Sequence, residues 1–200
     1  MNKVKAKPGQ DFKLLLERVR FFPAGVLSKL DTFDAIATKL ETRQFDARQV
    51  PSEVKSKVLE AARLTGSSSN TQHWRFILLD DPKAVNRLAE DSTTGQWVKE
   101  ANFAIIILTN PKVDGHMIDA GRALQDMQLA AWNLGVGSGI FTGFNNDRLK
   151  EDFAIPDNLV PAAALGFGYP AIKRSGKKKK RNQLNEIAYS DKFGQTLKVR

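Results

Sequence analysis

The chain of 200 residues suits one domain with a sizeable core or one subunit of a tight oligomer, and 42% hydrophobic and 26% charged residues are ordinary for a soluble globular protein. The absence of cysteine excludes disulfides, thiolate nucleophiles and cysteine-ligated metals, and two histidines leave little for a metal cage. The net charge of +9 lies in two short segments, residues 1–30 and 173–181, so we do not expect the body to bind nucleic acid.

The first thirty residues form a basic extension. Apolar residues recur at helical spacing over residues 12–22, with basic residues between them, until Pro23 and Gly25 end the pattern. Such an amphipathic helix can lie on a membrane surface or pack on the body or a partner subunit, and nothing else in the sequence suggests lipid. No secretory signal is present and the longest apolar run, residues 103–108, is too short to cross a bilayer. We therefore expect a cytoplasmic protein without a membrane partner.

The domain proper is predicted to begin with a helix. Asp31 is placed to cap this helix, which is expected to run to about Leu40. The residues expected to face the core are Phe33, Ile36, Ala37 and Leu40. Lys39 and Arg43, four residues apart, would direct two cations to one place if the helix continued. Most such charges are simply solvated, so the pair alone does not define a site.

A second helix, over residues 51–65, leads into a run of small hydrogen-bonding residues, 66–74, and then a strand at residues 75–79. Such a run is usually only a loop. It is also a suitable surface for a polyol or a phosphate, because hydroxyls and backbone N–H groups can converge there. Asp80 and Asp81 precede Pro82 in the pattern of a helix cap, so we assign them structural roles.

A buried strand over residues 104–108 precedes the longest periodic helix, residues 117–134. One stripe of this helix comprises Met117, Ala120, Leu124, Met127, Ala131 and Leu134. Other faces are also apolar, as Ile118 and Leu129 show, so the helix is predicted to be central and buried.

Glycines follow this helix. Gly135 stands where a left-handed cap ends a helix, and Gly137, Gly139 and Gly143 come next. A dinucleotide fingerprint needs strand, glycines and then helix, whereas the order here is reversed, which excludes a Rossmann site. The strand glycines indicate close approach of a backbone or a flat ligand, or else they only let the helix pack; these residues alone support both readings equally.

The last third contains a short helix over residues 147–153, a strand over 162–167, the basic run 177–181 and a helix-like segment beginning at Leu184. The basic run is typical of nucleic-acid binding or a localisation signal. Only one tyrosine and no tryptophan lie near it for base stacking, so nucleic acid is the weaker interpretation.

Five separated stretches resemble, in order, motifs of the FMN-dependent nitroreductase family. They are residues 39–45 (Arg-Arg-Ser-x-Arg-x-Phe in the family), 67–76 (Ser-Ser-x-Asn-x-Gln-Pro-Trp-x-Phe), 119–143 (Asp-x-Gly-x-Ala, then Leu-Gly-x-Gly-Ser), 165–170 (Leu-Gly-Tyr-Pro) and 180–194 (Lys-Arg-x-x-Leu-x-Glu-Ile). The resemblance implies an α+β fold with a central mixed sheet flanked by helices, in an intertwined homodimer with two FMN sites at the subunit interface. It assigns residues 31–200 to this FMN-binding domain and leaves residues 1–30 as the extension.

The resemblance also implies which residues contact FMN. The phosphate would be reached by Lys39, Lys179 and Arg181, and the ribityl or pyrimidine edge by Arg43. The second subunit would contact the ribityl chain and the phosphate through Ser67, Ser68, Ser69, Asn70 and Gln72. Flavin N5 would lie near Thr142 and Gly143. No catalytic side chain is implied, because the flavin carries the chemistry.

Four positions depart from the family pattern or are not fixed by it. Glu41 replaces a phosphate-binding serine, and a carboxylate beside a phosphate is unfavourable unless it pairs with Lys39 or Arg43. His73 replaces a proline and is interpreted as a loop residue, while Gly66, also at a proline position, should loosen the loop. Gln96 is the candidate for the pyrimidine edge.

The implied activity is hydride transfer from NADH or NADPH through flavin N5 to a small-molecule acceptor such as a nitroaromatic or a quinone. Two alternatives stay open: a flavin-binding family member that catalyses fragmentation or dehalogenation, and a basic interaction protein that binds nucleic acid through residues 177–181.

Overall fold

The computed structural model describes residues 31–172 and 180–198, so the predicted extension 1–30 and most of the basic run, including Lys179, lie outside the described residues. In chain order the helices and strands are α2 (Thr32–Thr38), α3 (Ser52–Leu64), β1 (Arg75–Leu79), α4 (Pro82–Glu90), β2 (Phe103–Thr109), α5 (His116–Asn133), β3 (Gly137–Phe141), α6 (Asn146–Asp152), β4 (Val160–Gly168) and α7 (Leu184–Ile187), with 3-10 turns at Ser68–Asn70 and Gln96–Glu100. The predicted order of elements is confirmed. Within the described ranges, no helix is long and apolar enough to cross a membrane.

The sheet has the strand order β1-β2-β4-β3, and each neighbouring pair runs antiparallel. The parallel component is a bridge between Glu41 and Ser138, which lays the segment after α2 beside β3. Gly139 on β3 is opposite Gly166 on β4, so the middle of this edge carries no side chains on either strand.

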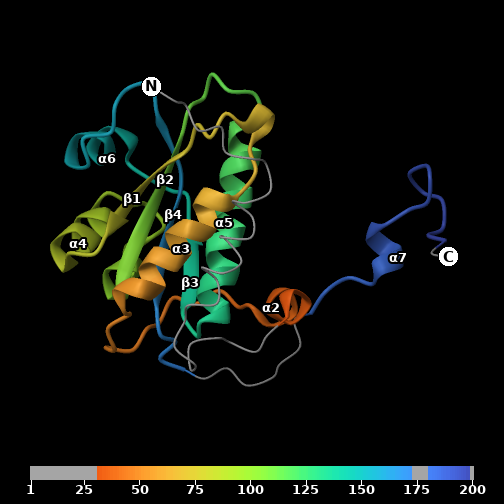
Figure 1. The fold of residues 1–200 in the computed structure, drawn as a ribbon, viewed down its shortest axis with the longest axis horizontal. Helices are drawn as coiled ribbons and strands as arrows, with labels where there is room; N and C mark the ends of the chain where they lie inside the picture. Colours follow the sequence, from red (N-terminus) through yellow and green to blue (C-terminus); the bar gives the residue numbers. More distant parts are fainter. Residues whose placement is uncertain (1–30, 173–179, 199–200) are drawn as a thin grey trace, which may run out of the picture.

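Helices cover both faces of the sheet (Figure 1). Successive residues of β2 point to opposite faces, and this separates two cores. Phe103, Ile105 and Ile107 pack with α3 and α5, whereas Ala104, Ile106 and Leu108 pack with α4 and α6. Every residue of β2 is buried, as predicted for this strand. The result is a three-layer α+β domain, which confirms the predicted fold class.

The predicted burial of α2 is wrong within one protomer. Asp31 caps the helix as expected, since its Oδ1 accepts a hydrogen bond from the Asp34 N–H at 2.8 Å. Phe33 is nevertheless 77% exposed and Ile36 48% exposed, and the buried residue of the helix is Ala35. The pattern identified an apolar face correctly, but residues 31–172 and 180–198 of the protomer leave it largely uncovered.

The central helix α5 buries one face along most of its length but not at its start. It packs on α3 and three strands, and its buried residues include Ala123, Met127 and Ala131. At its N-terminal end Met117 is 51% exposed and Ile118 is 71% exposed, so the prediction of a wholly buried helix is wrong there.

The C-terminal segment 180–198 projects away from the domain (Figure 1). Tyr189 pairs with Thr196 and its ring lies 4.7 Å from that of Phe193, so the segment folds back on itself. Leu184, Ile187 and Phe193 are exposed. An arm that carries apolar side chains into solvent in this way is typical of a surface that another chain covers.

Candidate cofactor-binding site

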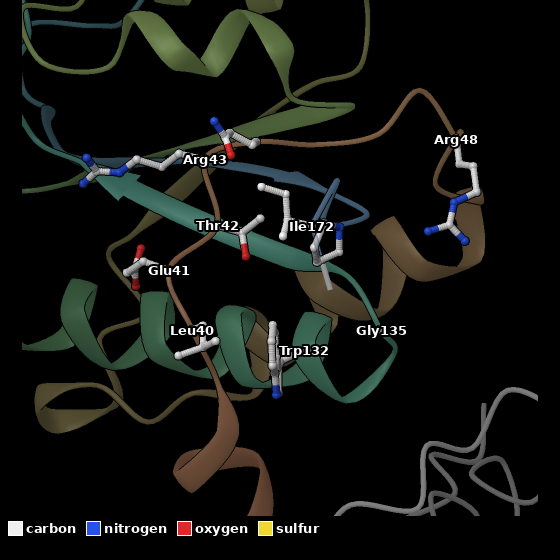
Figure 2. Close-up of a pocket in the computed structure, with 10 residues that line it drawn as sticks. Leu40, Glu41, Thr42, Arg43, Arg48, Trp132, Gly135 and Ile172 are labelled. Atoms are coloured by element: carbon white, nitrogen blue, oxygen red, sulfur yellow. The ribbon is translucent and has the colours of Figure 1, made fainter. Parts of the chain in front are cut away.

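The site is built on an extended segment, residues 39–45, that follows α2. The helix ends at Thr38 and the backbone of Lys39 is already extended. The Thr42 N–H donates to the Ser138 carbonyl at 2.9 Å, which fixes the segment against β3. The prediction that a helix brings Lys39 and Arg43 together is therefore wrong. In extended backbone, alternate residues point to the same side, so these two cations, four residues apart, still lie on one side of the segment. Figure 2 shows Glu41 and Arg43 directed away from Thr42.

Glu41 is the centre of the polar contacts on this side. Its carboxylate pairs with the Lys39 ammonium, one of the two cations considered for it in the sequence. It also accepts hydrogen bonds from Gln128 Nε2 at 3.3 Å and from the Ile140 N–H at 3.2 Å. Gln128 is 2% exposed and also donates to Ser138 Oγ at 3.2 Å. Sequence reasoning missed Gln128, although a glutamine within an otherwise apolar helix was a signal for it.

Arg43 rests on an aromatic cluster. Its guanidinium carbon lies 5.6 Å from the centroid of the Trp97 ring, and Trp97 packs edge-on against Phe141 at 5.7 Å. The sequence-based candidate from this stretch, Gln96, donates instead to the Ser92 carbonyl at 2.8 Å. Trp97, which sequence reasoning did not select, is thus the residue of this turn that faces Arg43.

The glycines of β3 have distinct roles. Gly135 ends α5 with a left-handed backbone, φ 78°, as predicted. A Cβ on Gly139 would lie 2.5 Å from the Thr42 carbonyl oxygen and 2.7 Å from the Trp97 ring. A Cβ on Gly137 would lie 2.5 Å from Thr42 Oγ1. Of the two readings left open by the sequence, close approach of another backbone holds for β3, and that backbone is the segment 39–45.

Thr142 and Gly143 follow β3 directly. The Gly143 carbonyl accepts a hydrogen bond from the Thr93 N–H at 2.9 Å, and a Cβ on Gly143 would lie 2.6 Å from Thr94 Oγ1. The turn after α4 therefore packs closely on Gly143, just beyond β3, the strand whose Ile140 N–H donates to Glu41.

The polar loop after α3 is anchored at the other end of α5. Asp119 Oδ2 accepts a hydrogen bond from the Ser68 N–H at 2.8 Å and lies 3.2 Å from His73 Nε2. Burial acts to raise the pKa of Asp119, but the hydrogen bonds from Ser68 and His73, together with the charge of Arg122, hold it below its ordinary value. His73 is buried and structural, which agrees with its interpretation as a loop residue. Sequence reasoning gave Asp119 no role.

The same loop has an unusual backbone. Ser69, Asn70 and Gln72 have φ values of 49°, 54° and 48°, in the left-handed region that non-glycine residues seldom adopt. The Gln72 N–H donates to Ser67 Oγ at 2.9 Å, which closes the turn on itself. Side chains of Ser68, Ser69, Asn70 and Gln72 are consequently displayed to solvent.

One protomer does not bring all the expected residues together. Asp119 and Gln128 are nine residues apart on α5, which is about 13 Å along the axis. The loop lies at one end of α5 and α2 with the segment 39–45 at the other (Figure 1). Arg181 lies on the projecting arm, where its guanidinium donates to the Lys180 carbonyl. Within the described residues of one chain, Lys39, Arg43, Thr142 and Gly143 share a region, whereas residues 67–72 and Arg181 lie elsewhere.

A cavity of about 750 Å³ opens beside the same segment. Its lining combines apolar groups, among them Leu40, Trp132 and Ile172, with the charged residues Glu41, Arg43 and Arg48 (Figure 2). The cavity therefore borders residues that are expected to bind the cofactor.

Asp91 supports the turn that covers Gly143. Its carbonyl accepts a hydrogen bond from the Asn145 N–H at 2.7 Å, and the next residue, Ser92, pairs with Phe144. Its side chain is fully buried, 3.2 Å from the Arg148 guanidinium. Burial, reinforced by the nearby Asp152 carboxylate, raises the pKa of Asp91 to about 6 against the opposing charge of Arg148.

This raised pKa predicts a pH-dependent stability. Since the folded chain binds the Asp91 proton more tightly than the unfolded chain, the stabilisation is complete below about pH 4 and is lost as pH rises through about 6. Urea unfolding at pH 4.5, 6 and 7.5 should show a loss on the order of 1–3 kcal/mol that Asp91→Asn abolishes. Asp157→Asn, at an exposed carboxylate, is the matched control. An unchanged slope in Asp91→Asn would contradict the assignment.

The three-layer domain, with its glycine strand beside an extended cationic segment, defines a fold found in solved structures. The chain superposes on the FMN-dependent nitroreductase from Clostridium difficile R20291 with a TM-score of 0.71 and 25% identity, covering 78% of this chain and 96% of that one. A protein of Methanothermobacter thermautotrophicus, provisionally named NADH dehydrogenase/NAD(P)H nitroreductase, is 33% identical over 156 residues, which cover 74% of this chain and 81% of the relative.

A third relative, the NADPH-dependent oxidoreductase of Staphylococcus haemolyticus, is 24% identical over 189 residues, 83% of this chain and 75% of its own length. The nitroreductase family model matches residues 37–112 and 94–169. The chain therefore belongs to the nitroreductase family, which confirms the resemblance drawn from the five stretches.

Proposed function

We propose that this protein is an FMN-dependent NAD(P)H oxidoreductase that reduces a nitroaromatic, a quinone or a similar small acceptor. The observation that carries the proposal is the placement of Lys39 and Arg43 on one side of an extended segment, beside β3, which Thr142 and Gly143 follow. Relatives named as an FMN-dependent nitroreductase and an NADPH-dependent oxidoreductase support the cofactor and the electron donor.

The residues present fit a phosphorylated cofactor. The Glu41 carboxylate is already held by an ammonium, an amide and a backbone N–H, which are the donor types that a phosphate requires. Lys39 would bind the phosphate together with Arg181 and Lys179, the latter outside the described residues, and Arg43 would face the pyrimidine or ribityl edge. Cations there stabilise negative charge on the reduced ring system.

When bound, the flavin supplies the redox chemistry by accepting a hydride from reduced nicotinamide at N5 and passing electrons to the acceptor. The protein's contribution is position. Backbone N–H groups of Thr142 and Gly143 would lie near N5, and the absence of a side chain at Gly143 lets the turn after α4 pack against this position. None of the described residues is assigned as a general acid, since the proposal needs none.

Each site would be completed by a second copy of the chain. Residues 67–72 are anchored at Asp119, which lies about 13 Å along α5 from Gln128, so they would serve the site of the other protomer. Exposed apolar side chains on α2, on the start of α5 and on the arm, including Phe33, Ile118 and Phe193, are the surfaces that a homodimer would cover. The cytoplasm is the proposed location of this homodimer.

The visible absorption spectrum of the purified protein tests the proposal. We expect a bound-flavin band that bleaches when NADH or NADPH is added under nitrogen. Arg43→Ala should weaken FMN binding or slow this reduction by about 10-fold or more, because a charge-assisted contact is lost. The control is Arg87→Ala, which removes the same charge from an exposed arginine on α4 that pairs with Glu90. A folded wild-type protein that stays colourless after incubation with FMN would refute the proposal.

A further inference from the structure

Glu41 is a half-exposed carboxylate that accepts hydrogen bonds from three donors. Its side chain is 45% exposed, yet Lys39, Gln128 and the Ile140 N–H all donate to it. Two of these donors are themselves well buried, since the Lys39 side chain is 11% exposed and Gln128 is 2% exposed. Donors from three separate elements thus converge on one anion.

This convergence has the composition of an anion-binding site. An ammonium, a primary amide and a main-chain N–H are also suitable donors for a phosphate monoester. The ion pair between Lys39 and Glu41 joins residues two apart and includes a carboxylate that is 45% exposed, so its own contribution to stability is modest. The site is therefore one that the chain's own carboxylate occupies.

We propose that Glu41 is a tethered competitor for the cofactor phosphate and so sets how strongly the protein prefers FMN over riboflavin. This inference rests on the proposed function. A phosphate dianion beside an ionised Glu41 is repelled, and Lys39 cannot give its full charge to both anions. Binding of the phosphate must therefore separate Glu41 from Lys39, a step that riboflavin, which lacks the phosphate, avoids.

The main chain allows this exchange. The backbone of the segment is fixed to β3 by the bridge between Glu41 and Ser138 and by the hydrogen bond from Thr42 N–H. Rotation of the Glu41 side chain therefore releases Lys39 without moving the segment. For the same reason, removing the charge of Glu41 should leave the local fold intact.

The test compares FMN with riboflavin by fluorescence titration of the full-length protein. In Glu41→Gln the dissociation constant for FMN is expected to fall by about tenfold, and that for riboflavin to change by less than about twofold. Glu41→Ser, which removes the tether as well as the charge, should shift the ratio in the same direction. Asp46→Asn is the matched control, because it removes the same charge from a carboxylate that pairs with Arg48, and it should leave the ratio unchanged.

Several results would overturn the inference. FMN affinity that falls in Glu41→Gln, or that changes in parallel with riboflavin affinity, would make Glu41 a supporting ligand. Loss of folding in both Glu41 variants, measured by circular dichroism, would make it structural. If the folded wild-type protein binds neither flavin, the proposed function fails as well, whereas wild-type binding of FMN with an unchanged ratio in the variants removes only this inference.

Discussion

Replacing Asp119 with asparagine is expected to lower the free energy of unfolding by about 2–3 kcal/mol and to reduce flavin content. The carboxylate is buried and receives the Ser68 N–H and His73, and it lies 3.5 Å from the Arg122 guanidinium. An asparagine keeps the shape but cannot accept from all three groups. Urea unfolding and the bound-flavin absorbance measure the two effects. Asp126→Asn, a carboxylate on the same helix that pairs with Thr65, is the control for loss of charge.

The same variant tests whether each site is shared between chains. Asp119→Asn damages the loop that one protomer would contribute, and Arg43→Ala damages the segment that the other would contribute. When the two variants are co-expressed and associate at random, half of the dimers are hybrid and each has one intact site. Roughly a quarter of all sites should then regain wild-type FMN affinity. If each site were built within one chain, the mixture would show only the average of the two variants.

Gly139→Ala is expected to cost about 2–4 kcal/mol of stability. The new Cβ would meet the Thr42 carbonyl oxygen at 2.5 Å, and this backbone cannot retreat without loss of the hydrogen bond that ties it to Ser138. Thermal or urea unfolding measures the loss, and FMN affinity should fall with it, since the displaced segment carries Lys39 and Arg43.

Gly121→Ala serves as the control for this change. Among the described residues, nothing beyond the helix's own backbone and the neighbouring residues lies within 4 Å of a Cβ at this position, and alanine favours a helix, so this variant should gain about 0.4–1 kcal/mol. A Gly139→Ala protein as stable as the wild type would mean that the segment is not held against β3. A loss in Gly121→Ala would instead indicate that a second copy covers this face.

The elements that local chemistry determines were predictable from the sequence. Asp81 caps α4, with its side chain accepting from the Lys83 N–H at 2.9 Å and Pro82 at the first helical position. β2 was predicted from its unbroken apolar run and is buried throughout. In both cases the residues that decide the structure lie next to each other in the chain.

Other features depend on contacts that the local pattern does not contain. Apolar spacing identified a face of α2 but could not show that Phe33 on this face is left exposed by the described part of the protomer. The end of α2 at Thr38 changed the geometry that joins Lys39 to Arg43. Gln128 and Trp97 reach the site from an apolar helix and a 3-10 turn, where neither spacing nor a motif gave them a partner.

The left-handed backbone of Ser69, Asn70 and Gln72 has a consequence for recognition. Each such residue raises the energy of the free loop, so this conformation persists only where surrounding contacts hold it, and here Asp119 does so. The hydroxyl and amide groups are therefore arranged before any ligand arrives. The loop loses its conformational entropy when the protomer folds, so less conformational entropy is lost when a ligand binds. A loop fixed in this way favours one small ligand over larger ligands of varied shape.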